Sequence, residues 1–235
     1  MNPNKSTTRL PGLLWLLSIV TGSFGLFYIR NYVIMPGDAA ATAANIISSE
    51  FLFRAAIVGI LSSQVFLFFF GLTLFHLFKR VDRVLATVFL ASIMMTVGIA
   101  VVNTLNHFGA LVVLSRPGYL AAFTSEQLNA IAMTFLRLGN SVGQGLLEIF
   151  WTPYYFSFGL LIVRGKFLPK LLGVLLMIMS VGFAINVLDK FLVPQFHPLL
   201  FTRLAMSLGA LGNIPTVLWL LIKGITVQPP DEQAS

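Results

Sequence analysis

Long apolar stretches separated by short polar segments recur six times along this chain. Each stretch is long enough to cross the hydrocarbon core of a bilayer as an α-helix, which takes about 20 residues. We expect the helices at about residues 10–29, 55–78, 84–106, 135–163, 168–188 and 199–222. The pattern predicts an all-α protein, a six-transmembrane-helix bundle that forms one membrane domain over residues 10–223. Residues 1–9 and 224–235 are expected to be tails, the second of them disordered.

The connections differ between the two sides of the predicted bundle. Those on one side are short, whereas those on the other are long and rich in turn and capping residues. Pro36-Gly37 is a turn sequence, and Asp38 is a good N-cap for a short interfacial helix at about residues 39–48. Thr124 and Gln127 fit a capping box that starts a helix leading into the fourth stretch. We therefore expect structured outer loops, and a structured face is where binding sites usually lie.

Composition supports a membrane environment. Hydrophobic residues make up 57% of the chain and charged residues only 10%, with a mean hydropathy of +0.89. A soluble domain usually carries about 25% charged residues, so this chain cannot cover a water-facing surface. Its main expected partner is therefore the lipid bilayer. Disorder of the whole chain is excluded because disordered chains are poor in aromatic residues, and this one has 22 Phe.

Basic residues set the predicted orientation. Lys and Arg number 15 against 8 Asp and Glu, a formal net charge of +7. No basic run is long enough for a groove-binding arm, so nucleic acid is not an expected partner. On one side of the predicted bundle lie Lys5, Arg9, Lys79, Arg80, Arg83, Arg164, Lys166, Lys170 and Lys223. The other side has six basic residues, and the positive-inside rule therefore places both termini in the cytoplasm.

The chain lacks the residues that several kinds of metal site and catalytic site require. The chain has no cysteine, which excludes disulfides, zinc–thiolate sites, iron–sulfur clusters and a Cys nucleophile. His76, His107 and His197 are far apart, without metal-ligand spacing, and no nucleotide-binding or serine-nucleophile motif occurs. We expect no metal and no cofactor. The absence of any catalytic signature, with no catalytic residue to assign, favours a protein that is not an enzyme.

The fourth stretch carries the most informative polar pattern. Arg137, Ser141, Gln144 and Glu148 are four, three and four residues apart, so a regular helix places them on one stripe, which Asn140 flanks. Glu148 lies about 16 Å along the helix from Arg137. A lipid-facing carboxylate at that depth costs at least ~2.5 kcal/mol, so Glu148 should face protein, a cation or water. Its role is then either functional or structural, as a member of an interhelical ion pair or as a protonated acid bonded to a neighbouring amide.

Polar residues of the other stretches fall in the same outer half. Asn186, Asp189 and Lys190 lie near the outer end of the fifth stretch. The residues expected to line a polar cavity open to the outer side are Arg137, Asn140, Ser141, Gln144, Glu148, Asn103, His107 and Arg203. Arg54 and Arg203 are the expected ion-pair partners of Glu148, because both start at the outer edge and have long side chains. Gly139 and Gly143 are four residues apart, a spacing that permits close helix approach.

One segment carries a family resemblance. Residues 36–54, which read PGDAAATAANIISSEFLFR, resemble the signature of the bacterial integral membrane proteins catalogued as domain-of-unknown-function family 4386. The similarity continues in Lys79-Arg80-Val81-Asp82, in Ile149-Phe150-Trp151 and over residues 165–173, and it covers nearly the whole chain.

The resemblance implies a small multi-pass protein of the cytoplasmic (inner) membrane, and it implies no activity. Positions that match the family motif are Asp38, Asn45, Glu50 and Arg54. Many family members have a His near the start of the fourth stretch, where this chain has Arg137. That difference disfavours a His-centred mechanism.

Three functional hypotheses follow. The first is binding or transport of a small molecule in the polar cavity. The second is a membrane-embedded enzyme that acts on a lipid or another apolar substrate, with Glu148 or His107 as general base. The third is a sensory or assembly subunit of a membrane complex. Because six helices are few for a transporter, the sequence also leaves a homodimer open.

Overall fold

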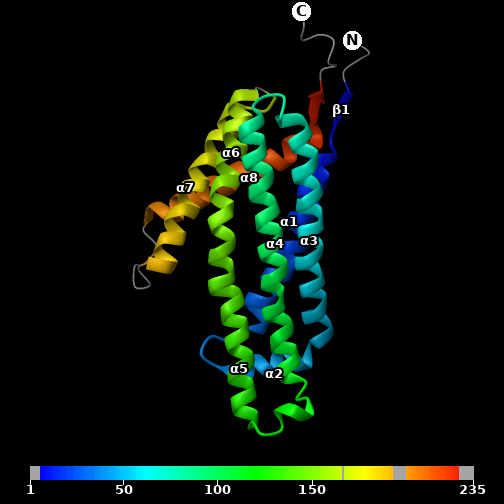
Figure 1. Cartoon of the computed structure of the whole chain (residues 1–235), viewed down its shortest axis with the longest axis vertical. Helices are drawn as coiled ribbons and strands as arrows, with labels where there is room; N and C mark the ends of the chain where they lie inside the picture. Colours follow the sequence, from blue (N-terminus) through cyan, green and yellow to red (C-terminus); the bar gives the residue numbers. More distant parts are fainter. Residues whose placement is uncertain (1–5, 166, 193–199, 228–235) are drawn as a thin grey trace, which may run out of the picture. The chain divides into compact units, whose positions relative to one another are not determined.

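The computed structural model describes residues 6–165, 167–192 and 200–227, and helices make up nearly all of them (Figure 1). The elements are β1 (Ser6–Thr8), α1 (Leu10–Tyr28), the π-helical segment η1 (Ile29–Val33), α2 (Ala39–Ser48), α3 (Glu50–Phe78), α4 (Arg83–Leu114), the 3-10 turn η2 (Gly118–Leu120), α5 (Ser125–Arg137), the π-helical segment η3 (Leu138–Gly143), α6 (Gln144–Gly165), α7 (Lys170–Leu192), α8 (Leu200–Ile222) and β2 (Ile225–Val227). The predicted helical class is confirmed. A two-stranded β1–β2 ladder is the one non-helical pairing in the described residues.

Five helical segments of the described residues are long and apolar enough to cross a bilayer. They are Leu10–Val33, Glu50–Phe78, Arg83–Leu114, Ser125–Gly165 and Lys170–Leu192. The sixth predicted stretch also forms a helix, α8. Its apolar segment within the described residues, Gly209–Ile222, is shorter than the other five. The described parts of all six predicted stretches are therefore largely helical, and five of them are long and apolar enough to span a membrane.

Several helices extend beyond the predicted membrane boundaries. The helix α3 begins at Glu50 rather than near residue 55, and α4 continues to Leu114 rather than ending near residue 106. With 32 residues, α4 is about 48 Å long, whereas a hydrocarbon core is about 30 Å thick. Hydropathy identifies only the apolar part of such a helix. The backbone hydrogen bonds of the helix can continue beyond the hydrocarbon core into water.

The chain folds into two compact units. Unit 1 comprises residues 1–17, 66–96 and 148–235, and unit 2 comprises residues 18–65 and 97–147. The helices α1, α3, α4 and α6 each contribute residues to both units.

Aromatic side chains form the core of unit 1. Trp15, Phe70, Phe78, Phe89 and Phe158 are all buried. The ring centroids of Trp15 and Phe70 lie 4.9 Å apart, and those of Phe89 and Phe158 lie 5.4 Å apart. Such pairs stabilise a core beyond their area burial, by about 0.5–1.5 kcal/mol each. The five side chains therefore serve core packing in unit 1.

Aliphatic side chains dominate the core of unit 2. Ile29, Ile46, Ile57, Leu128 and Leu136 are buried there together with Phe53, and the helices α2 and α5 pack against each other. These residues come from η1, α2, α3 and α5, so the connections that contain α2 and α5 share a hydrophobic core with α3. The prediction that these connections are structured is confirmed.

The local capping predictions for unit 2 are also confirmed. The helix α2 spans Ala39–Ser48, and Asp38 Oδ1 accepts a hydrogen bond of 2.8 Å from the backbone N–H of Ala41. At the start of α5, Thr124 Oγ1 accepts from the N–H of Gln127, and Gln127 Oε1 accepts from the N–H of Thr124. These reciprocal bonds satisfy two backbone donors that a helix start leaves unpaired.

Candidate functional site

A π-helical segment interrupts the predicted polar stripe. The stripe assumed one regular helix through residues 135–163, but η3 occupies Leu138–Gly143 between α5 and α6. A π-helix bonds residue i to i+5, so it changes the angular position of every residue that follows it. Arg137 and Ser141 are exposed, Gln144 is half-buried and Glu148 is buried. The assumption of an unbroken α-helix was therefore wrong, and 100° steps do not relate these four positions.

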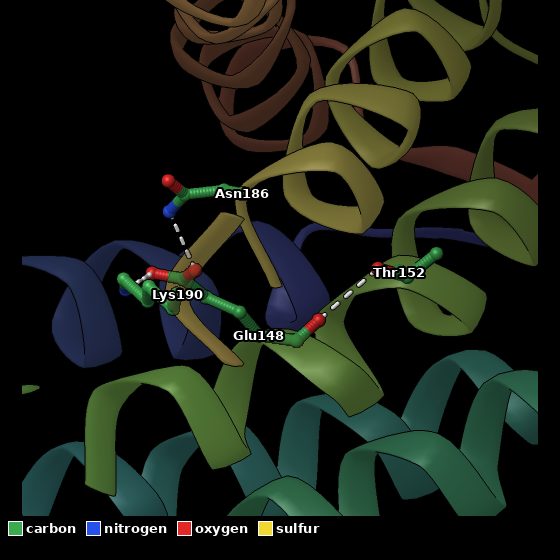
Figure 2. Close-up of polar contacts among 4 residues, drawn as sticks. All are labelled: Glu148, Thr152, Asn186 and Lys190. Atoms are coloured by element: carbon green, nitrogen blue, oxygen red, sulfur yellow. Dashed lines mark hydrogen bonds and ion pairs between the residues drawn. The ribbon is translucent and has the colours of Figure 1, made fainter. Parts of the chain in front are cut away.

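Glu148 is the centre of a polar cluster in unit 1 (Figure 2). Its Oε1 accepts from Lys190 Nζ at 2.8 Å, and its Oε2 accepts from Asn186 Nδ2 at 2.6 Å. Asn186 and Lys190 stand four residues apart on α7, so they lie on one face of that helix. The backbone carbonyl of Glu148 accepts from Thr152 Oγ1 at 3.1 Å, within α6. Both carboxylate oxygens are thus held by α7.

The structure assigns a different cation to Glu148 from the two that were expected. Arg54 binds Glu50, with Nη2 at 2.6 Å and Nε at 2.7 Å from Oε1. The prediction that Arg54 pairs with Glu148 was wrong, because a carboxylate one turn away on the same helix offers Arg54 a local partner. The side chain of Arg203 lies outside the described residues, although its backbone belongs to α8.

Burial makes the Glu148–Lys190 pair energetically important. The Glu148 side chain is 6% exposed and the Lys190 side chain is 27% exposed. Desolvation opposes such a pair, yet removing one partner costs about 3–5 kcal/mol because a buried charge is left without compensation. The adjacent Asp189 has a buried Oδ1 with no hydrogen-bond partner among the described residues. The cluster is therefore a neutralised pair to which Asn186 adds a second hydrogen bond.

A second polar cluster lies in unit 2, where α4 meets η3. Asn103 Nδ2 donates to the carbonyl of Gly139 at 3.1 Å, and Asn106 Nδ2 donates to Asn103 Oδ1 at 3.0 Å. A Cβ added at Gly143 would overlap the Asn103 amide, and one added at Gly139 would lie 3.2 Å from Asn106 Cβ. The close approach predicted for the two glycines is therefore observed, and it allows Asn103 to reach a carbonyl of the π-helical segment.

His107 lies one turn along α4 from Asn103 and is 3% exposed. Its ring centroid is 6.4 Å from that of Phe53. Neither Nδ1 nor Nε2 has a hydrogen-bond partner in the part of the chain that the structure describes. Buried polar atoms are almost always paired, so this imidazole is an exception that calls for a reason.

The remaining predicted site residues make local contacts. Asn45 Nδ2 donates to the carbonyl of Val33 at 3.2 Å, and Asn140 Nδ2 donates to the carbonyl of Leu136 at 3.0 Å. Asp38 caps α2, and Glu50 binds Arg54. The four residues that match the family motif, Asp38, Asn45, Glu50 and Arg54, therefore stabilise the local structure around α2 and the start of α3.

Sequence reasoning placed Asn186 and Lys190 near the outer end of α7 without pairing either with Glu148. Their spacing of four residues was the signal that could have linked them to one carboxylate. Within the described residues, no group of three or more His, Asp or Glu side chains is arranged to hold a metal ion.

Comparison with known proteins identifies the family. The family model described as "Domain of unknown function (DUF4386)" matches residues 10–224. Searches of curated proteins and of solved structures gave no match. The matched region contains both polar clusters and every described helix, so the resemblance read from the motif at residues 36–54 is confirmed. The chain belongs to the DUF4386 family.

Proposed function

We propose that this protein binds or transports a small polar molecule at the cluster formed by Glu148, Asn186 and Lys190, together with Asp189, the residue that precedes Lys190 in α7. The observation that carries this proposal is a buried carboxylate held at both oxygens by a second helix. Well-packed apolar residues are often as stable as a buried ion pair, or more stable. A pair kept inside apolar helices is therefore expected to serve more than stability, and intramembrane ionisable residues commonly mark substrate pathways.

The free hydrogen-bonding capacity of the cluster suggests the kind of ligand. An ammonium group has three donors, and Lys190 bonds Glu148 while 27% of its side chain is exposed. Asp189, the preceding residue of α7, has a buried carboxylate oxygen without a hydrogen-bond partner among the described residues. A molecule with an acceptor group for Lys190 and an amino or hydroxyl group for Asp189 satisfies both. Small zwitterions and polyols have this combination.

We further propose six membrane spans, a cytoplasmic location for both termini, and a cluster open to the outer side of the cytoplasmic membrane. With 23 residues, α8 is about 34 Å long, which is enough for a sixth span. An even number of spans places the two termini on the same side. The distribution of basic residues, nine on that side against six, supports the cytoplasmic assignment.

The test is uptake and binding by the full chain in proteoliposomes, with a panel of radiolabelled amino acids and polyols. Glu148→Gln should reduce the active signal at least tenfold, whereas Glu126→Gln, on the exposed face of α5, should leave it unchanged. Unchanged uptake and binding in Glu148→Gln across the panel would contradict the proposal.

A charge-exchanged variant separates ligand binding from stability. Glu148→Lys combined with Lys190→Glu keeps an ion pair between α6 and α7 but reverses its direction. We expect thermal stability to recover toward that of the unmodified protein while uptake stays low. Recovery of both would assign the pair a purely structural role.

A second candidate function is a membrane-embedded enzyme acting on a lipid, and His107 is the observation that favours it. A buried imidazole with two unpartnered nitrogens has the free acceptor that a general base needs. Glu148 is less suited, because both of its oxygens are already bonded. Product formation from a lipid panel that disappears in His107→Gln, but persists in His76→Gln, would replace the binding proposal with this one.

A further inference from the structure

Exposed basic residues gather at one end of unit 1. The α3–α4 turn, the C-terminal ends of α6 and α8, the N-terminal end of α7 and the β1–β2 ladder all lie at this end (Figure 1). The described basic residues there, all exposed, are Arg9, Lys79, Arg80, Arg83, Arg164, Lys170 and Lys223. We call this set the basic end of unit 1.

Tertiary contacts bring these residues together from distant parts of the chain. Asp82 Oδ1 accepts from the N–H of Leu85 at 3.0 Å, and Asp82 Oδ2 binds Arg164, which joins the α3–α4 turn to the end of α6. The β-ladder pairs Thr8 with Ile225, and this register sets Arg9 beside the end of α8. Lys223 Nζ lies 4.5 Å from the centroid of the Trp219 ring.

The charge at this end is not balanced within the described residues. Asp82 is the one acidic residue among the elements named, and its two oxygens are already bonded. Arg83 and Lys170 are the first residues of α4 and α7. A cation at a helix N-terminus is unfavourable for the helix, so helix stability does not explain these two positions.

The residues at the basic end of unit 1 are of the kinds that lie in the lipid headgroup layer, where anions are concentrated. Trp is enriched at the membrane–water interface, and the Lys223 ammonium stacks on Trp219 at the end of an apolar helix. Long basic side chains at helix ends direct their charge to the headgroup layer. The anions concentrated in that layer are lipid phosphates, and each nearby Lys or Arg adds measurable attraction to anionic lipid.

We infer that the basic end of unit 1 is a binding surface for anionic phospholipid headgroups. The inference is independent of the proposed small-molecule site, which lies near the opposite end of α7. The proposed partner, anionic lipid, would bind at residues other than those of the small-molecule site.

The experiment measures lipid retention by native mass spectrometry of the full chain in mixed micelles. The probes are phosphatidylglycerol and phosphatidylcholine with the same acyl chains. We expect preferential retention of phosphatidylglycerol, and Arg83→Gln combined with Lys170→Gln should reduce that preference about 30-fold. The matched control, Arg30→Gln with Arg116→Gln, removes the same charge from exposed positions of unit 2 and should leave the preference unchanged.

Other outcomes overturn the inference. Equal retention of the two lipids by the unmodified protein would remove it, and an equal loss in the control variant would show that only net charge matters. Inorganic phosphate at millimolar concentration that displaces the lipid would identify a site for free anions instead. If the first double variant does not fold, Lys79→Gln with Lys223→Gln tests the same surface, with thermal unfolding as the check on folding.

Discussion

Units 1 and 2 accommodate polar side chains in apolar helices by different means. Unit 1 joins α6 to α7 with a charged pair, Glu148 and Lys190, beside an aromatic core. Unit 2 joins α4 to η3 with neutral amides, Asn103 and Asn106, beside an aliphatic core. Loss of one partner of a buried ion pair leaves an uncompensated charge and is strongly destabilising. Loss of a hydrogen bond between neutral amides costs less free energy. The unit with the charged pair should therefore be the more sensitive to a single polar substitution.

The largest expected effect is that of Lys190→Met. It leaves the Glu148 carboxylate buried with Asn186 as its remaining partner, and we expect a loss of about 3–5 kcal/mol in the free energy of unfolding. Denaturant unfolding in micelles measures it, with the exposed Lys79→Met as the matched control. The double variant Glu148→Gln with Lys190→Met should recover most of the loss. A single variant no less stable than the control would show that the pair adds nothing to unit 1.

A smaller effect is expected in unit 2 from Gly143→Ala. The new methyl group overlaps the Asn103 amide, so the helices must separate or Asn103 must leave the Gly139 carbonyl. We expect a loss of about 1–3 kcal/mol, the usual cost of overpacking. Thermal unfolding and amide hydrogen exchange at residues 138–143 measure the change.

The control for this prediction is Gly98→Ala, because a Cβ at Gly98 meets no atom within 4 Å. That substitution should be neutral or slightly stabilising, since Ala is the better helix former by about 1 kcal/mol. The double variant Gly143→Ala with Asn103→Ala should relieve part of the loss. If Gly143→Ala is as stable as Gly98→Ala, the amide contact does not depend on the glycine.

The smallest effect is expected at the exposed pair in unit 2. Glu50 and Arg54 have side chains 51% and 55% exposed, so Glu50→Gln should cost only about 0.3–0.5 kcal/mol. The same denaturant series, repeated at high salt, measures it, and salt should abolish the difference. A cost comparable to that of Lys190→Met would mean that burial does not separate the two pairs.

Features that depend on a few neighbouring residues were predictable from the chain. The Asp38 cap, the Thr124–Gln127 capping box and the helix at Ala39–Ser48 were each predicted and are each present. The Glu50–Arg54 pair is equally local, and a spacing of four on one helix was sufficient to find it. The prediction that Arg54 pairs with Glu148 was wrong because the Glu50 carboxylate lies one turn from Arg54 on the same helix.

The candidate site depended on features that neighbouring residues do not specify. The π-helical segment η3 changed the angular relation between Arg137 and Glu148, and its glycines are also common in regular membrane helices. Lys190 lies 42 residues from Glu148, and several other cations were equally plausible at that separation.

The sequence by itself therefore determined the helical class, the apolar stretches and the ends of the short helices, because propensity, hydropathy and capping act within one or two turns. Only the tertiary structure decided which cation reaches Glu148, which carbonyl Asn103 binds and which basic residues share one end of unit 1. Those choices are set by how whole helices pack, and packing depends on the shapes of many distant side chains together.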